Sequence, residues 1–364
     1  MVILHVSKSN KYSGMENVAI NIIKSMPEDI RSVYLIATGS IETKLLDLDV
    51  EYIGVEKVDE EAIKKAIEEI KPDIIHAYEY DCSLMCTKVT DTVPIISHLY
   101  SIPKWVQKIG PKSVIYGGAC KNFAKIIIPD KVVEEKAWFR DKMEDKTVVM
   151  QTPFNAVKIF EKGYVPGTEM SKEKLEKYKS DLLFVGYLTE DKNPYEFIRI
   201  VDEVKKTHPE IKAIIVGGGD LGSGCLELIG KMGLSDNIIM VGMQYNPYLY
   251  MNQTRILVAP SKFEGFGMAA VEAMAFGKPV VASRTGGFGI TVTDDCGKIC
   301  GNDKKPIDRA AFVENIVELL DNSEIYKLKS EGARKRAKEL NNFDTYMEEI
   351  KNIYEDTYKA YKQN

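Results

Sequence analysis

Residues 256–287 of the chain read ILVAPSKFEGFGMAAVEAMAFGKPVVASRTGG. The segment opens with an apolar run of the kind found in strands covered on both faces, and Gly265 and Gly267 then permit a tight turn of the backbone. A helix is predicted over residues 268–276, and a second apolar run follows at 279–283. This order of strand, turn, helix and strand is typical of an α/β fold with a parallel sheet.

Short apolar runs alternate with helical patterns on both sides of this segment. In the first half, strands are predicted over residues 2–7, 32–38, 51–55, 73–77, 94–99, 125–130 and 147–151. In the second half, they are predicted over residues 181–187, 212–216, 237–242, 256–261 and 279–283. Apolar residues three and four positions apart predict helices over residues 15–26, 60–71 and 342–361. We therefore expect two Rossmann-like, doubly wound parallel sheets.

The alternation is interrupted once, by a stretch rich in charge and containing glycine and proline. This stretch reads EKGYVPGTEMSKEKLEKYKS over residues 161–180, and we interpret it as a linker. The predicted domains are therefore 1–160 and 181–341, followed by a C-terminal helix within 342–364. Two open α/β sheets that face each other would bind ligands at the carboxyl ends of their strands.

The composition excludes several classes of protein. With 45% hydrophobic and 28% charged residues, the 364-residue chain can bury large cores, which excludes global disorder. A formal net charge of −5 argues against a nucleic-acid partner, since such proteins usually carry a basic excess. The chain has no run of roughly 20 apolar residues, and its N-terminus, MVILHVSKSN, lacks the layout of a signal peptide. Six cysteines over this length do not make a disulfide scaffold, so a cytoplasmic location is expected.

The helix at 268–276 carries the strongest functional signal. Backbone amides of Gly267, Met268 and Ala269 would point outward at its N-terminus, where unpaired N–H groups and the helix dipole favour an anion. Glu272 is the only charged residue of this helix, and a buried carboxylate is costly unless it accepts hydrogen bonds. The hydroxyls of a ribose are natural donors to it. The alternative is that Glu272 pairs with a basic side chain or with backbone amides and only orders the helix.

This segment closely resembles the E-x7-E signature of retaining glycosyltransferases with the GT-B fold, family 4 (glycosyl transferases group 1). Glu264 matches the first acid and Glu272 the second, and the turn between them is formed by Gly265, Phe266 and Gly267. Motifs elsewhere agree in order: Gly14 in a glycine loop after the first strand, His98 at a strand end, and Lys192 in a loop resembling the family's phosphate-binding loop. The resemblance spans most of the chain.

The resemblance implies a hexosyltransferase that moves a sugar from a nucleotide-diphosphate-sugar donor to an acceptor hydroxyl with retention of configuration, without a metal ion or cofactor. Lys192, Glu264 and His98 are the catalytic candidates. Lys192 and the amides of residues 267–269 would bind the diphosphate, Glu264 the donor sugar and Glu272 the ribose. Met243 would contact the base through its backbone. His98 would orient the sugar or the acceptor, and the C-terminal helix would pack back on the N-terminal domain.

Two positions depart from the family pattern. An arginine commonly stands where this chain has Tyr187, so Lys192 and the helix N-terminus, or another cation, must neutralise more of the diphosphate. The first glycine of the usual pair is replaced by Ser13. The alternative functions are a nucleotide-sugar epimerase of the GT-B fold and an inactive nucleotide-sugar-binding relative.

Two further motifs favour simpler interpretations. Gly217, Gly219 and Gly222 formally satisfy a dinucleotide-binding fingerprint, but the next predicted strand, 237–242, has no acid at its end. A glycine-rich turn near the nucleotide is therefore preferred. The cysteines include two C-x3-C pairs, but the pairs lie in different predicted domains and no histidine accompanies either. No metal site is expected.

The acceptor half contains a basic stretch. Residues 101–128 include five lysines and no acidic residue, interleaved with Trp105 and other apolar side chains. Such a stretch can lie at an anionic membrane interface, in which case the protein would bind peripherally at the inner face of the membrane. The alternative, an ordinary solvated surface, is preferred from sequence alone. The acceptor is a small molecule, a glycan or a lipid.

Overall fold

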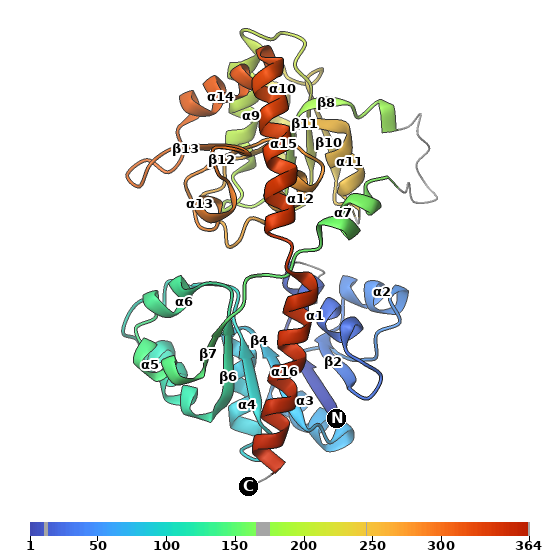
Figure 1. Cartoon of the computed structure of the whole chain (residues 1–364), viewed down its shortest axis with the longest axis vertical. Coiled ribbons are helices and arrows are strands. Elements are labelled where there is room, and N and C mark those ends of the chain that lie inside the picture. The colour runs from blue at the N-terminus through green and yellow to red at the C-terminus, as the bar shows by residue number, and fades with distance from the viewer. Residues whose placement is uncertain (11–13, 165–174, 245, 363–364) are drawn as a thin grey trace. The chain divides into compact units, whose positions relative to one another are not determined.

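The computed structural model describes residues 1–10, 14–164, 175–244 and 246–362. The chain forms two compact units. Unit 1 comprises Met1–Pro153 and Asn342–Asn364, and unit 2 comprises Phe154–Asn341. Each unit is built on one parallel sheet with helices on both faces (Figure 1).

The sheet of unit 1 has seven parallel strands in the order β3-β2-β1-β4-β5-β6-β7. The strands are β1 (Val2–Val6), β2 (Arg31–Ala37), β3 (Tyr52–Val55), β4 (Ile74–Tyr78), β5 (Ile95–His98), β6 (Phe123–Ile128) and β7 (Thr147–Val149). The order of connection reverses between β1 and β4. In open α/β sheets, ligands bind outside the carboxyl ends of the strands at such a reversal.

Helices cover both faces of this sheet because successive strand residues point to opposite sides. Leu4 and Ile75 are buried on the face that packs against α3, α4 and α5, whereas Ile3 and Ile74 are buried on the face that packs against α1 and α16. The helices are α1 (Gly14–Ser25), α2 (Ser40–Asp47), α3 (Glu60–Ile70), α4 (Glu79–Val89), α5 (Pro111–Ala119), α6 (Lys131–Lys136) and α16 (Phe343–Lys362).

The C-terminal helix α16 belongs to the core of unit 1. Its buried face presents Tyr346, Met347, Ile350 and Tyr354 to the sheet and to α1. These residues are spaced by one, three and four positions, so they lie on one side of a helix. The last helix of the chain therefore completes the hydrophobic core of the first unit.

The sheet of unit 2 has six parallel strands in the order β10-β9-β8-β11-β12-β13. They are β8 (Ser180–Val185), β9 (Ala213–Val216), β10 (Ile238–Gly242), β11 (Thr254–Ala259), β12 (Val280–Ser283) and β13 (Gly297–Cys300). The connection order again reverses, here between β8 and β11. The two doubly wound parallel sheets predicted from sequence are thus confirmed.

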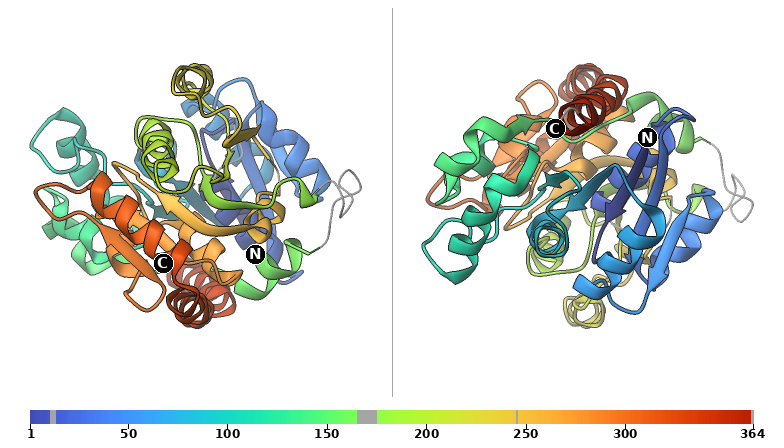
Figure 2. Two further views of the ribbon diagram at one scale, coloured as in Figure 1. Left: turned by 90° about the horizontal axis from the view of Figure 1, so that it is seen from above. Right: turned by 90° about the horizontal axis from the view of Figure 1, so that it is seen from below.

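The two faces of this sheet are covered by different helices (Figure 2). Leu183 and Leu257 pack against α11, α12 and α15, whereas Leu182 and Ile256 pack against α9, α10 and α14. The helices are α7 (Ala156–Lys162), α9 (Pro194–Lys205), α10 (Gly222–Lys231), α11 (Tyr248–Gln253), α12 (Met268–Ala275), α13 (Phe288–Thr291), α14 (Arg309–Asp321) and α15 (Ser323–Glu339).

The division between the units differs from the predicted domain limits. Unit 2 begins at Phe154, not after residue 160, because Phe154 and Ile159 of the α7 region are buried in the same core as Phe276. Leu175, at the end of the predicted linker 161–180, is buried in this core as well. Residues 165–174 of the predicted linker lie outside the described residues.

Candidate functional site

The turn between β11 and α12 is held by backbone contacts that only glycine permits. Gly267 has φ +83°, and the amide of Gly287 donates a hydrogen bond of 2.6 Å to the carbonyl of Gly265. A Cβ atom added to Gly286 would lie 1.5 Å from the carbonyl oxygen of Glu264. The close approach of these two loops fixes the backbone that carries Glu264 immediately before the N-terminus of α12.

Glu264 of this turn forms an ion pair with Lys192 of the loop after β8. Nζ of Lys192 lies 2.6 Å from Oε2 of Glu264, and the side chains are 29% and 13% exposed, so both remain accessible from solvent. The loop of Lys192 is fastened by Asn193, which has φ +55° and donates from its side-chain nitrogen to the carbonyl of Pro260 at 3.1 Å. The structure thus brings together two of the predicted catalytic residues.

Glu272 lies on α12 and has a partner that the sequence did not indicate. The hydroxyl of Tyr248 donates a hydrogen bond of 3.1 Å to Oε1 of Glu272. Burial raises the pKa of this carboxyl to about 7, an effect opposed by the Tyr248 hydrogen bond and by the charge of Lys162. The carboxyl therefore titrates near neutral pH.

The turns after β8, β9 and β10 pack backbone against backbone. Gly217 has φ +151°, and a Cβ atom there would lie 1.9 Å from the carbonyl oxygen of Gly186. Its amide donates to the carbonyl of Gly242 at 2.9 Å. Beside Gly218, Met243 leaves 57% of its surface exposed just past β10. The glycine run is thus explained by tight packing of three turns, and Met243 lies next to it.

A second lysine lies beside the loop of Lys192. The backbone amide of Lys262 donates to the carbonyl of Asp191 at 2.7 Å, and its ammonium pairs with Glu190 at 2.7 Å. Lys262 is two residues before Glu264 and is exposed, so it is a second cation within the same pair of loops. No motif or spacing singles out Lys262, since it occupies an ordinary loop position. The place where the family commonly has arginine holds Tyr187, as the sequence shows.

His98 ends β5 in unit 1 and is buried among aromatic side chains. Its Nε2 lies 3.1 Å from the hydroxyl of Tyr346 on α16, its Nδ1 lies 3.0 Å from Nε2 of His76, and its ring stacks on Tyr100. The imidazole is 1% exposed, and burial lowers its pKa to about 3, so it is neutral at physiological pH. The catalytic role of His98 stays a prediction.

Gly14 begins α1, after the carboxyl end of β1, and a Cβ atom there would meet no heavy atom within 4 Å. Its neighbour Ser13 lies outside the described residues. On the same helix, Glu16 is 1% exposed and accepts from the hydroxyl of Ser7, although 3.4 Å makes this a long hydrogen bond. The first helix therefore brings a buried carboxylate to the carboxyl edge of the sheet of unit 1.

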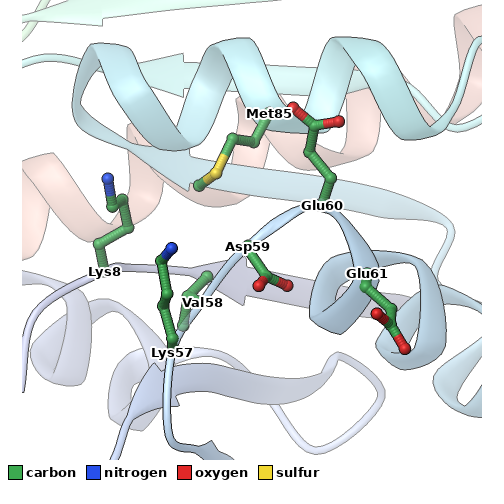
Figure 3. A pocket seen from close by; sticks show the side chains of 7 residues that line it. All are labelled: Lys8, Lys57, Val58, Asp59, Glu60, Glu61 and Met85. Atoms are coloured by element: carbon green, nitrogen blue, oxygen red, sulfur yellow. The ribbon is translucent and has the colours of Figure 1, made fainter.

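A shallow pocket of about 370 Å³ lies beside the same edge (Figure 3). Lys8 follows β1 and Lys57 follows β3, and both ammonium groups point to the side on which α4 carries Met85. Lys8 also lies 3.6 Å from Asp81. The wall of the pocket is completed by Val58, Asp59, Glu60 and Glu61. Its charges are mixed, so the pocket by itself does not select an anionic or a cationic ligand.

The described residues contain no group of three or more His, Cys, Asp or Glu side chains that could hold a metal ion. All six cysteines are buried free thiols. No helix in the described part of the chain is long and apolar enough to cross a membrane.

Comparison with known proteins finds a number of similar chains, including the following three. The chain is 28% identical over 245 residues to an uncharacterized glycosyltransferase of Methanocaldococcus jannaschii, covering 61% of this chain and 58% of that protein. It is 27% identical to a D-inositol 3-phosphate glycosyltransferase of Corynebacterium kroppenstedtii, covering 54% of this chain and 46% of the relative. The structure of HepE from Anabaena in complex with UDP-glucose aligns with a TM-score of 0.82 at 18% identity, over 98% of this chain and 100% of HepE.

The structural likeness to HepE concerns the fold, and the family match lies within unit 2. Residues 167–336 match the family described as Glycosyl transferases group 1. That segment contains Lys192, the glycine turn and both glutamates of the E-x7-E motif. Residues 167–336 are thus similar to the glycosyl transferases group 1, and the chain as a whole shares the fold of HepE.

Proposed function

We propose that the protein transfers a sugar from a nucleoside diphosphate sugar to an acceptor hydroxyl, with retention of configuration. The observation that carries this proposal is the Lys192–Glu264 ion pair in the turn before α12. It joins a cation and a hydrogen-bond acceptor at the carboxyl edge of a doubly wound sheet, where α/β proteins bind nucleotides. The group 1 family match over the same residues supports it.

In this proposal the diphosphate binds between Lys192 and the N-terminus of α12. The first N–H groups of a helix have no acceptor within the helix, so those of residues 267–269 are available to phosphate oxygens. Lys262 supplies a second cation at the neighbouring loop, in place of the arginine that Tyr187 replaces. Two lysines and one helix dipole then balance the charge of the diphosphate.

The remaining groups of the donor are assigned to three residues. When the diphosphate replaces Glu264 as the ion-pair partner of Lys192, Glu264 accepts hydrogen bonds from hydroxyls of the transferred sugar. Glu272, held by Tyr248, accepts from the ribose hydroxyls. Met243, exposed beside Gly218, contacts the base through its backbone. A uridine diphosphate sugar is the first donor to test, because HepE shares the fold and its structure contains UDP-glucose.

In the proposed sugar transfer, the roles of these residues follow from where negative charge develops during the reaction. The bond from the sugar C1 to the diphosphate oxygen breaks and its electron pair stays on that oxygen, while the acceptor oxygen bonds to C1 on the same face. The acceptor proton passes to the departing phosphate oxygen. Lys192 and the amides of α12 bind the growing negative charge more strongly in the transition state than in the ground state, which accelerates the reaction. No metal ion or cofactor is needed in this scheme.

His98 would orient the donor sugar or the acceptor, not act as the principal base. A neutral imidazole suits such a role, and burial keeps this one neutral. Because its Nε2 contacts the hydroxyl of Tyr346, a direct contact with a substrate requires Tyr346 to release that bond. We propose that unit 1 binds the acceptor, a small molecule, a glycan or a lipid, in the cytoplasm.

The test is binding and turnover with defined donors in the presence of EDTA. Calorimetry with UDP, GDP, ADP and UDP-glucose should show one nucleoside diphosphate bound preferentially, with affinity reduced by Glu272→Gln and unchanged by the exposed control Glu314→Gln. Proton NMR of the product then reports the anomeric configuration. The proposal is wrong if no nucleoside diphosphate binds, and its retaining step is wrong if the configuration is inverted.

A further inference from the structure

Unit 1 presents an apolar and basic surface around the N-terminal half of α5. We define this α5 surface by six exposed residues: Lys104, Lys108, Ile109, Lys112, Val114 and Ile115. The side chains of Ile109, Val114 and Ile115 are 72%, 49% and 56% exposed. Three large aliphatic side chains within seven residues of sequence are therefore left in water, and such clusters mark interaction sites more often than single exposed residues do.

The outward position of these side chains is fixed by the opposite face of α5. Ser113, Tyr116 and Ala119 are buried, and Tyr116 donates to or accepts from the hydroxyl of Ser97 at 2.7 Å. Tyr116 also packs against Phe139 with ring centroids 5.2 Å apart. Because one face of α5 is anchored in the core, Val114 and Ile115 cannot turn inward without losing those contacts.

The charge of this surface selects the kind of partner. Residues 101–128 contain five lysines and no acidic residue, so the exposed aliphatic groups are flanked only by cations within this stretch. In the next segment, 131–146, acids and bases alternate: Glu134, Glu135, Asp141, Glu144 and Asp145 stand among Lys131, Lys136, Arg140, Lys142 and Lys146. Three of the five lysines, Lys104, Lys108 and Lys112, belong to the α5 surface, which itself contains no acidic residue.

The α5 surface also lies near the edge of the sheet where the acceptor is expected. The loop that leads to α5 starts at the carboxyl end of β5, and parallel strands bind ligands at that end. A tryptophan lies against the same loop, since the amide of Trp138 donates to the carbonyl of Val106 at 2.9 Å and its side chain is 41% exposed. Tryptophan is enriched at membrane–water interfaces, where its ring is apolar and its N–H is hydrated.

We propose that the α5 surface docks unit 1 on an anionic phospholipid bilayer and that the acceptor is a lipid presented at that bilayer. The lysines bind the lipid phosphates while Ile109, Val114 and Ile115 enter the headgroup region. The lipid nature of the acceptor rests on the proposed function, whereas the docking does not. A monotopic contact of this kind needs no membrane-spanning helix.

The test is sedimentation of the full chain with vesicles of phosphatidylglycerol and phosphatidylcholine at low and at high salt, without any donor. The variant Lys104→Glu/Lys108→Glu/Lys112→Glu should bind about a hundredfold more weakly at low salt, since each lysine contributes about a factor of five. The matched control Lys64→Glu/Lys304→Glu/Lys327→Glu reverses three exposed lysines elsewhere, so it has the same net charge and should still bind.

A second variant tests insertion. Ile109→Ser with Ile115→Ser removes apolar area at exposed positions, so it should fold normally and lose the binding that persists at high salt. The docking proposal is overturned if the parent chain does not sediment with anionic vesicles at low salt, or if both lysine variants lose binding equally. Docking with turnover only on water-soluble acceptors overturns the lipid assignment alone. Loss of donor binding by calorimetry contradicts the proposed function and leaves the docking result intact.

Discussion

Nζ of Lys192 lies 2.6 Å from Oε2 of Glu264, although 72 positions separate the two residues in the chain. The pair joins the loop after β8 to the turn before α12, so it fixes the two loops that we propose to hold the donor. Without a diphosphate, each side chain neutralises the other. In the proposed function, a bound diphosphate would become the partner of Lys192, which would leave the Glu264 carboxylate available to sugar hydroxyls.

Lys192→Ala should lower kcat about a hundredfold, because removal of a single group that stabilises developing negative charge has an effect of this order. The donor dissociation constant should rise less, since the charge on the diphosphate increases along the reaction path. Steady-state kinetics with the preferred donor measures both quantities. A matched control is Lys206→Ala, which removes an exposed lysine of unit 2 that pairs with Glu203 and should leave kcat unchanged.

The role of Lys262 as a second cation can be tested in the Lys192→Ala variant. Tyr187→Arg in the Lys192→Ala variant restores the charge that the family commonly has at this position, and it should recover part of the lost rate. Lys262→Ala in that background should lower the rate further, because Lys262 is the neighbouring cation in the paired loops. If neither change alters kcat while both variants stay folded, the phosphate-binding groups are different from those proposed.

The donor affinity should fall as the pH is lowered through about 7. Burial raises the pKa of Glu272 to about 7 in the free protein, and only the ionised carboxylate is a strong acceptor for two ribose hydroxyls. Between pH 8 and pH 6 the ionised fraction falls from about 90% to about 10%, so the dissociation constant should rise roughly tenfold. Calorimetry at several pH values measures this dependence.

Two variants separate Glu272 from the titration of the nucleotide itself. Glu272→Gln should bind weakly at every pH and show only the dependence that the phosphates contribute. Tyr248→Phe removes the hydrogen bond that lowers the pKa of Glu272, so the midpoint should move to higher pH. A midpoint that stays in place in Tyr248→Phe contradicts the assignment of the pH dependence to Glu272.

The parallel sheets were predictable because their strands are continuous apolar runs. The strand β13 was missed because its four residues include Gly297 and Lys298, and so short a run shows no pattern. The unit boundary was missed for a related reason: α7 carries a short apolar face whose partner, Phe276, is more than a hundred residues away. Periodicity reports which residues are buried and does not identify what buries them.

The same distinction between local pattern and distant partner applies to the candidate site. Glu264 and Glu272 could be selected from a spacing of eight residues around a glycine turn, which is local information. The partner of Glu272, Tyr248, comes from a separate helix 24 positions earlier, and no spacing links the two. The burial of His98 depends on Tyr346, 248 positions away, so its environment could not be read from the strand that carries it.

Unit 1 should lose stability as the pH falls below about 6.5. Burial lowers the pKa values of His5 and His98 to about 3 and that of His76 well below its ordinary value, whereas all three titrate near 6.5 in the unfolded chain. Between these limits the unfolded chain binds more protons, so the free energy of unfolding decreases as the pH decreases. Each histidine should contribute roughly 1 kcal/mol over the first pH unit below 6.5.

Tryptophan fluorescence can follow this loss, because both tryptophans, Trp105 and Trp138, are in unit 1. Urea unfolding at pH 7.5, 6.5 and 5.5 should give midpoints that fall with pH. His98→Asn should reduce the pH dependence, whatever its effect on stability at pH 7.5. The control His208→Gln changes a histidine of unit 2 and should leave the pH dependence of this signal unaltered. A midpoint independent of pH would show that these histidines titrate with the same pKa in the folded and the unfolded chain.

The close approach of two loops at Gly286 should be indispensable to the donor site. Gly286 has φ +49°, and a Cβ atom there would lie 1.5 Å from the carbonyl oxygen of Glu264, so Gly286→Ala must displace the turn that carries this glutamate. A non-glycine residue in this backbone conformation costs about 1–3 kcal/mol before the steric clash is added. The variant should therefore be less stable and should bind the donor weakly.

Gly289→Ala is the matched control, because a Cβ atom at Gly289 in α13 meets no heavy atom within 4 Å. Thermal unfolding and calorimetry with the preferred nucleoside diphosphate should show parental values for Gly289→Ala and losses in both for Gly286→Ala. Parental donor affinity in a folded Gly286→Ala protein would mean that the position of the Glu264 turn does not determine binding.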